Sequence, residues 1–86
     1  MPPPVPPSVT LYGKPGCCLC DDARETVAAV RRELPFDLEE VDVSIDPALM
    51  REYGERIPVL EVDGEELFEL RVDPLELRQR LGTVTT

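Results

Sequence analysis

Residues 11–21 read Leu-Tyr-Gly-Lys-Pro-Gly-Cys-Cys-Leu-Cys-Asp, and they join an apolar, β-prone run to an amphipathic helical pattern through a Gly-Lys-Pro-Gly turn. Cys17 and Cys20 therefore form a C-x-x-C pair at a predicted helix start, where two sulfurs on one turn lie within disulfide reach. Unpaired backbone N–H groups and the positive end of the helix dipole favour a thiolate there. The thiolate is the reactive form of cysteine. A C-x-x-C pair beside a βαβ pattern, in a chain without an export signal, is typical of a redox motif.

The length and the cysteine positions limit what kind of protein this chain encodes. Its 86 residues predict one domain. All three cysteines fall within residues 17–20, so they close no long loop and add little to the stability of the fold. Residues 1–7 are proline-rich and lack the basic start and apolar core of a secretory signal. No apolar run is long enough for a membrane span. We therefore expect a cytoplasmic protein, in which a C-x-x-C pair acts transiently or catalytically.

Charge narrows the range of partners. The chain has 18 acidic and 9 basic residues, no histidine, and a net charge of −9. Nucleic acids and anionic membranes bind basic patches, so neither is expected as a partner. The excess of acid either serves solubility or favours a basic partner protein, and the sequence leaves both interpretations open.

The first half of the chain predicts a strand, a long helix and a second strand. The strand covers residues 9–12. The helix has one apolar face with spacings of four, four, three and four, and ends at Pro35; its apolar residues are Leu19, Ala23, Val27, Val30 and Leu34. The second strand covers residues 36–43, and a slip in its alternation between Leu38 and Val41 indicates a bulge or a partly exposed edge.

The second half predicts a short helix, a hairpin and a final helix. Ser44 or Asp46 caps the helix at residues 48–53, and Gly54 is expected to end it in the left-handed conformation. Strands at 59–62 and 66–70 flank Asp63-Gly64, a strong hairpin signal. The last helix begins at Asp73-Pro74, with Glu76 closing a capping box, and ends at Gly82. Its Leu77 and Leu81 should face the sheet.

The predicted order is therefore β-α-β-α-β-β-α. A strand–helix–strand unit requires a parallel pair, and the hairpin adds antiparallel strands. We predict an α/β fold with a mixed four-stranded sheet and helices packed on it. Residues 1–7 are expected to form a flexible arm, and residues 83–86 a tail.

Three stretches resemble those of a known family. They are residues 11–21 with the C-x-x-C pair, residues 41–43 of the second strand, and residues 53–60, in which Ile57-Pro58 precedes the third strand. The arrangement resembles the thioredoxin fold and, within it, the small glutaredoxin-like family, over Ser8 to Leu81. The resemblance implies a glutaredoxin-like domain at residues 8–82 that acts as a thiol–disulfide oxidoreductase. We expect a monomer with no required cofactor, whose thiol or disulfide substrate is glutathione or a protein.

The resemblance also implies roles for four residues other than cysteines. In this fold the proline before strand three has a cis peptide bond and faces the cysteines; here it is Pro58, which would leave the backbone of Ile57 free to pair with an extended thiol substrate. A lysine at the position of Lys14 is linked to thiolate stabilisation and to a substrate carboxylate; its other interpretation is a solvated surface charge. Glutaredoxins carry a Gly-Gly turn where this chain has residues 70–73. Asp73 is the one candidate there for the γ-glutamyl end of glutathione, a possible co-substrate, and it is equally a helix cap.

The three cysteines are expected to differ in role. Cys17 lies just before the helix, where its side chain points outward, so it is the candidate nucleophile. Cys20 lies inside the first turn and should be more buried, which suits a resolving thiol. Cys18 is an auxiliary thiol: a redox spectator, a glutathionylation site or a rival resolving group, although a disulfide between neighbours is strained. Repulsion from Asp21 and Asp22 should limit how far the pKa of Cys17 falls.

Two further chemistries use cysteines in similar patterns. The alternative function is a non-catalytic thiol module that binds a metal, an iron–sulfur cluster or a redox partner protein. A zinc site needs four ligands, which three cysteines and no histidine do not supply without an aspartate or a second chain, so no metal is predicted. Residues 18–24 also fit the phosphatase pattern C-x5-R. Asp21 and Asp22 would, however, repel a phosphate substrate.

Overall fold

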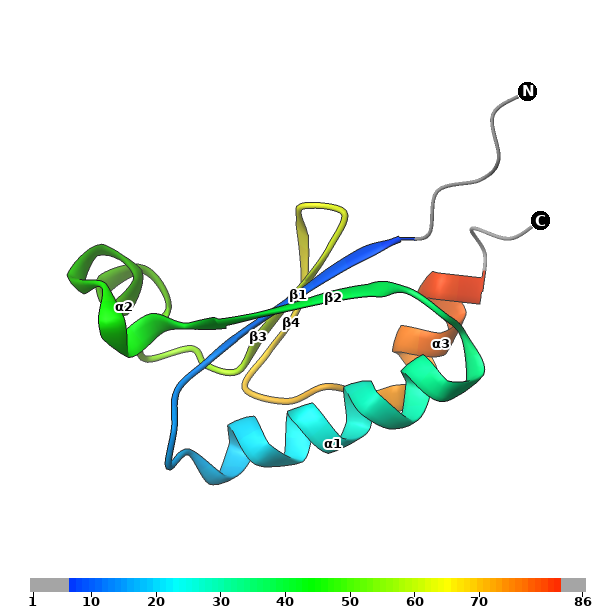
Figure 1. Cartoon of the computed structure of the whole chain (residues 1–86), viewed down its shortest axis with the longest axis horizontal. Helices are drawn as coiled ribbons and strands as arrows, with labels where there is room; N and C mark the ends of the chain where they lie inside the picture. The colour runs from blue at the N-terminus through cyan, green and yellow to red at the C-terminus, as the bar shows by residue number, and fades with distance from the viewer. Residues whose placement is uncertain (1–6, 83–86) are drawn as a thin grey trace.

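The computed structural model describes residues 7–82, and the predicted element order is confirmed (Figure 1). Its strands are β1 (Ser8–Gly13), β2 (Asp37–Asp42), β3 (Val59–Val62) and β4 (Glu65–Glu69). Its helices are α1 (Cys18–Glu33), α2 (Pro47–Tyr53) and α3 (Pro74–Gly82), with the 3-10 helix η1 (Val43–Ile45) between β2 and α2. Apart from Pro7, the expected arm and tail lie outside the described residues.

The four strands form one mixed sheet in the order β2-β1-β3-β4. β1 pairs in parallel with β2 and antiparallel with β3, and β4 pairs antiparallel with β3. β2 is an edge strand of this sheet, which explains its slipped alternation. A bulge does not explain it, because the pairing of β2 with β1 runs from Ser8 to Gly13 without a register shift. The irregularity lies instead between β3 and β4, at Leu60/Glu61.

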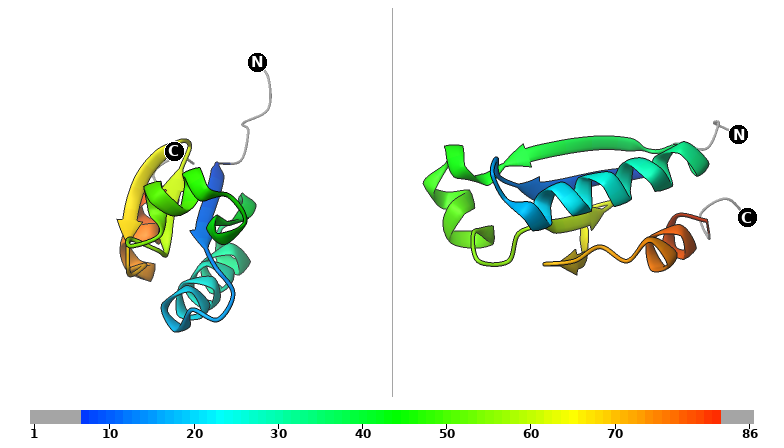
Figure 2. Two further views of the ribbon diagram at one scale, coloured as in Figure 1. Left: turned by 90° about the vertical axis from the view of Figure 1, so that its left-hand side faces the viewer. Right: turned by 90° about the horizontal axis from the view of Figure 1, so that it is seen from below.

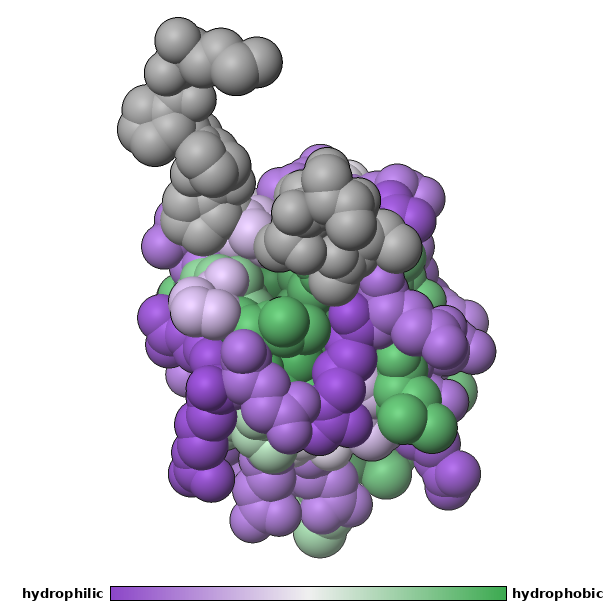
Figure 3. All heavy atoms as spheres, turned by 90° about the vertical axis from the view of Figure 1, so that its right-hand side faces the viewer, coloured by the Kyte–Doolittle hydropathy of each residue, from purple (hydrophilic) through white to green (hydrophobic). Residues whose placement is uncertain are grey.

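The main core lies between one face of the sheet and the helices α1 and α3, whereas α2 lies beyond the end of the strands (Figures 1 and 2). Leu77 and Leu81 of α3 are buried in this core, as predicted. The other buried members are Val9, Leu11, Ala23, Val27, Val30, Phe36, Leu60, Val62 and Val72. Hydrophilic residues predominate on the face that Figure 3 shows, and apolar residues appear there only in patches between them.

The predicted apolar face of α1 is wrong at its first position. Leu19 is 45% exposed, and the buried residue of that turn is Cys20, which is 1% exposed. The inward stripe thus runs through Cys20, Ala23, Val27 and Val30, with spacings of three, four and three, which is equally helical. Cys20 packs on Val43 and Ile57 at the end of the sheet rather than on the main core, so the burial of this turn depends on those neighbours.

Local turn chemistry explains the remaining elements, with two corrections. Asp63 (φ 52°) and Gly64 (φ 84°) both have positive φ, as a tight hairpin turn requires. Asp46 caps α2 by accepting from the N–H of Ala48 at 2.8 Å. Gly54 is right-handed (φ −54°), not left-handed as expected. Within residues 7–82 the Glu76 side chain makes no hydrogen bond back to Asp73, so the predicted capping box is only a one-sided cap.

The need for glycine at position 54 is steric. A Cβ on Gly54 would lie 2.4 Å from the carbonyl oxygen of Met50, closer than any real contact of that kind. The backbone of the α2 end is thus packed so tightly that a side chain has no room there.

Candidate active site

The predicted nucleophile lies where β1 ends and α1 begins. Cys17 is the N-cap of α1, with extended φ and ψ of −96° and 116°. The backbone N–H of Cys20 donates to its Sγ at 3.3 Å. The sulfur thus replaces the usual cap oxygen at the positive end of the helix dipole. This position favours the charged form of Cys17.

The C-x-x-C pair divides into an accessible and a buried sulfur. All three cysteines are free thiols: Cys17 is half-buried, Cys18 is exposed and Cys20 is buried. A hydrogen bond from the Cys20 thiol lowers the pKa of Cys17, burial opposes this, and the N–H groups of Cys20 and Leu19 and the charge of Lys14 lower it further. Burial raises the pKa of Cys20 to about 11, and its hydrogen bond to Cys17 adds to the rise. When one of the two thiols loses its proton, Cys20 therefore keeps its own and Cys17 becomes the thiolate.

This asymmetry predicts the order of alkylation. A thiolate forms as the pH rises past the pKa, so iodoacetamide should modify Cys17 at a half-maximal rate below about pH 8.5, the value for an ordinary thiol. Cys20 should stay unmodified in the folded protein until the pH approaches 11. Mass spectrometry of peptides after timed quenching measures both rates. In the urea-unfolded chain the two residues should react alike, and faster modification of Cys20 than of Cys17 in the folded protein would contradict the geometry.

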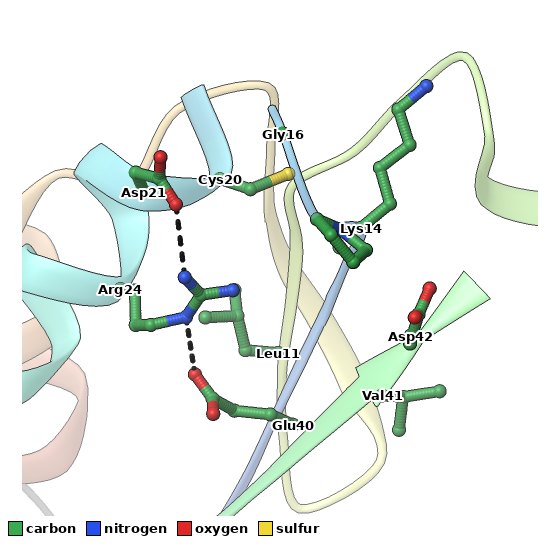
Figure 4. A pocket seen from close by; sticks show the side chains of 11 residues that line it. Leu11, Lys14, Gly16, Cys20, Asp21, Arg24, Glu40, Val41 and Asp42 are labelled. Atoms are coloured by element: carbon green, nitrogen blue, oxygen red, sulfur yellow. Dashed lines mark hydrogen bonds and ion pairs between the residues drawn. The ribbon is translucent and has the colours of Figure 1, made fainter. Parts of the chain in front are cut away.

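Cys20 is accommodated by a residue without a side chain. A Cβ on Gly13 would lie 3.1 Å from the Cys20 Sγ, so glycine at the end of β1 leaves the space that this sulfur fills. Cys20 also forms part of the wall of a cleft of about 400 Å³ between the β1–α1 turn and β2. Figure 4 shows Arg24 in this cleft, bound to Asp21 at 3.0 Å and to Glu40 at 2.8 Å. No signal in the sequence indicated the partner of Arg24 on β2.

Lys14 lies in the same turn, and it acts at a distance. Its charge is the smallest of the effects that lower the pKa of Cys17. In Figure 4 its ammonium group points away from Cys20 and out of the cleft. Lys14 thus lies beside the site, and its ammonium group lies outside the cleft.

Ile57 and Pro58 lie in the connection from α2 to β3. Both are buried, and the peptide bond between them is cis. Ile57 belongs to the same apolar cluster as Cys20 and Val43, and Cys17 packs against that cluster. The structure therefore brings Ile57 together with the C-x-x-C pair, although Ile57 lies 37 positions after Cys20 in the sequence.

Sequence reasoning did not detect an aromatic pair that packs against this cluster. Tyr12 of β1 stacks on Tyr53 of α2, with ring centroids 4.2 Å apart and an interplanar angle of 14°. The Tyr12 hydroxyl donates to Glu61 at 3.1 Å. Burial, together with hydrogen bonds to Tyr53 and Glu61, raises the pKa of Tyr12 well above its usual range. This pair attaches α2 to the sheet and so positions the α2–β3 connection.

Asp73, the residue that the sequence offers as a glutathione contact, lies at the start of α3. Asp73 caps α3, its Oδ1 accepting from the N–H groups of Leu75 at 2.9 Å and Glu76 at 3.4 Å. The structure places it in the cap and not in the cysteine cluster.

Within residues 7–82 no group of three or more His, Cys, Asp or Glu side chains is arranged to hold a metal ion. In the same range no helix is both long and apolar enough to cross a bilayer.

A mixed four-stranded sheet with helices on it, and a C-x-x-C pair between its first strand and helix, is the architecture of the thioredoxin fold. A mutant thioredoxin from Halobacterium salinarum has this fold in common with the chain, with a TM-score of 0.69 at 22% identity over 95% of this chain and 77% of that one. The fold is therefore thioredoxin-like.

Comparison with known protein families identifies the family within the thioredoxin fold to which this chain belongs. The model of the glutaredoxin-like domain family (DUF836) matches residues 8–82, and the chain belongs to this family. An uncharacterized protein, Rv0508 of Mycobacterium tuberculosis, is 34% identical over 84 residues, covering 92% of this chain and 87% of that protein. The X-ray structure of the target protein XcR50 from X. campestris is similar, with a TM-score of 0.72 and 37% identity over 87% of this chain and 96% of that one.

Proposed function

We propose that this protein is a thiol–disulfide oxidoreductase that works by a dithiol mechanism. The observation that carries the proposal is the Cys17 sulfur, which caps α1 and accepts the N–H of Cys20 at 3.3 Å while the Cys20 thiol is buried beneath it. A sulfur whose charged form is stabilised and accessible is a nucleophile, and a protonated neighbour one helical turn away is a resolving group.

The reaction balances with the two thiols alone. The Cys17 thiolate attacks one sulfur of a substrate disulfide; that S–S bond breaks, and the leaving thiolate takes the electron pair and a proton from water. Cys17 is then in a mixed disulfide. Cys20 loses its proton to water and attacks the Cys17 Sγ, and the second substrate thiolate leaves. The protein ends with a Cys17–Cys20 disulfide, and the substrate has gained two electrons, which a thiol reductant returns to the protein.

The neighbouring residues support the same proposal. The backbone beside Pro58 offers an extended substrate a surface for main-chain pairing, through Ile57. Lys14 supplies a positive charge for the thiolate and for a substrate carboxylate. Cys18 takes no part in the cycle as a spectator thiol. Glutathione or a protein serves as the substrate, Asp73 is the candidate contact for glutathione, and a cytoplasmic monomer without a cofactor suffices for this chemistry.

A redox titration and a single-turnover reaction test the proposal. After mild oxidation with diamide, we expect peptide mapping to find Cys17 joined to Cys20, with a reduction potential above about −300 mV. We expect the reduced protein to be oxidised by bis(2-hydroxyethyl) disulfide with release of two mercaptoethanol molecules. A potential far below that of the cytosolic thiol pool, together with no turnover, would overturn the proposal. Colour or tightly held metal in the purified protein would favour a binding module instead.

A further inference from the structure

Helix α2 leads into the Ile57–Pro58 connection, and none of its own residues is buried. It lies beyond the end of the strands (Figure 1), where its half-buried Leu49 and Tyr53 pack against the cysteine cluster. Hydrophobic stabilisation scales with the apolar area removed from water, so burial alone holds this helix weakly. Other interactions must keep the connection at a fixed place relative to the sheet.

Arg56, inside this connection, supplies such interactions in two directions. Toward α2, its Nε and Nη2 donate to the carbonyl oxygen of Glu52 at 3.2 and 3.1 Å, and its guanidinium carbon lies 5.3 Å from the centroid of the Tyr53 ring. Toward β4, its guanidinium binds the carboxylates of Glu66 at 3.0 Å and Glu69 at 3.4 Å. This one side chain thus clamps the last turn of α2 to an edge strand of the sheet.

The main chain of the same connection is held by Leu70, the residue that follows β4. Its N–H donates to the carbonyl oxygens of Pro58 at 2.8 Å and Arg56 at 3.1 Å. These two residues flank Ile57, whose backbone is proposed to pair with the substrate. The connection is therefore held on both sides of that residue.

The charges around Arg56 make its guanidinium the group on which the clamp depends. The carboxylate of Glu52 lies 3.8 Å away, so three carboxylates from α2 and β4 surround one cation. Arginine suits this arrangement because its planar fork presents five donors, whereas the lysine ammonium is a point charge. Removal of the cation leaves the acidic groups of α2 and β4 facing one another, and like charges repel.

We propose that Arg56 is a positioning residue for thiol–disulfide exchange: by clamping α2 to β4, it holds the backbone of Ile57 where an extended substrate bound to Cys17 can pair with it. The inference rests on the proposed function, because Cys17 must form the mixed disulfide. Ile57 belongs to the cluster against which Cys17 packs, so a shift of the connection moves the pairing backbone relative to the sulfur. The effect should be largest for substrates that have a main chain to pair.

Two disulfides that differ in their main chain test this role. One is the symmetric disulfide of the blocked pentapeptide acetyl-Ala-Ala-Cys-Ala-Ala-amide, and the other is bis(2-hydroxyethyl) disulfide, which has no peptide group. We expect Arg56→Gln to lower the second-order rate constant for the peptide disulfide by about tenfold, and that for the small disulfide by at most about twofold. Arg56→Lys keeps the charge without the planar fork, so its loss should be intermediate. Stopped-flow single turnovers measure both rate constants.

Arg78→Gln is the matched control. Arg78 of α3 binds Glu33 of α1, and its side chain is 34% exposed, close to the 32% of Arg56. Both of its rate constants should stay within about twofold of wild type. The Tm of Arg56→Gln and of Arg78→Gln should fall by similar amounts, less than about 6 °C, because partly exposed ion pairs add little stability. Equal losses for both disulfides in Arg56→Gln, or the same selective loss in Arg78→Gln, would overturn the positioning role.

Glu66→Gln tests whether Arg56 acts through β4. This variant alone should lose less of the rate with the peptide disulfide than Arg56→Gln, because Glu69 still binds the guanidinium. The double variant should lose no more than Arg56→Gln alone, since the two changes break the same contact. Losses that multiply in the double variant would show that Arg56 acts independently of β4, and would overturn the clamp.

Hydrogen exchange of the Leu70 amide separates the two proposals, because it needs no redox chemistry. This N–H bonds the carbonyls on both sides of Ile57, so NMR should find its exchange at least about fivefold faster in Arg56→Gln and within about twofold of wild type in Arg78→Gln. If the wild-type protein fails to react with bis(2-hydroxyethyl) disulfide, the redox function is overturned, and the exchange rates still decide the clamp. Normal redox reactions with unchanged Leu70 exchange in Arg56→Gln overturn the clamp alone.

Discussion

Cys17→Ser is expected to lower the second-order rate constant for reaction with bis(2-hydroxyethyl) disulfide by about a hundredfold or more, to that of an ordinary thiol. The reason is geometric. Cys17 is the sulfur at the α1 N-terminus that accepts the Cys20 N–H, and neither remaining thiol has that position. Cys18 is exposed but is not the cap, and Cys20 is buried with a pKa of about 11. Stopped-flow mixing, with acid quench and mass spectrometry, measures the rate.

Two matched cysteine variants complete this prediction. Cys18→Ser should react within about twofold of wild type, because it leaves the cap and its hydrogen bond intact. Cys20→Ser should attack the disulfide but stop at a mixed disulfide on Cys17, visible as one added mercaptoethanol, since no resolving thiol remains. A mixed disulfide on Cys18, or full internal oxidation in Cys17→Ser at the wild-type rate, would assign the nucleophile to a different sulfur and would contradict the mechanism.

Gly54→Ala is expected to destabilise the fold by about 2–3 kcal/mol, a large share of what a domain of this size has. The alanine Cβ would have to occupy a position 2.4 Å from the Met50 carbonyl oxygen, so the end of α2 must move. Leu49 and Tyr53 of α2 pack against the cluster that contains Cys20 and Ile57. The movement should therefore also disturb the aromatic stack and the cysteine site. Urea unfolding followed by far-UV circular dichroism measures the loss.

Gly64→Ala separates this clash from ordinary glycine flexibility. Gly64 has a φ of +84°, and a Cβ added there would have no neighbouring atom within 4 Å. Alanine at this position therefore meets only the cost of a left-handed backbone, about 1 kcal/mol. If Gly54→Ala lost no more stability than Gly64→Ala, the close approach of α2 to Gly54 would not exist in solution, and Gly54 would have the left-handed role that the sequence suggested.

Much of the fold follows from interactions between residues near one another in the chain. The Asp63-Gly64 turn needs positive φ at two successive positions, and Asp73-Pro74 and Asp46-Pro47 supply a cap oxygen and a preset φ to the helices that follow. Such signals depend on a few neighbouring backbone atoms, which is why the element order could be predicted correctly. The C-x-x-C pair is of the same kind, since the cap geometry of Cys17 is contained within one helical turn.

Other features depend on which distant segments meet. The burial of Cys20 in place of Leu19, the ion pair between Arg24 and Glu40, and the stack of Tyr12 on Tyr53 all join residues that share no local pattern. Gly54 illustrates the limit most clearly: a glycine after a helix is compatible with either backbone handedness, and its packing against Met50 selected one. Local chemistry specifies the elements because its range is a single turn. Packing at the end of the sheet decides that Leu19 stays accessible while Cys20 meets Val43 and Ile57, because burial is a property of the neighbours that arrive there.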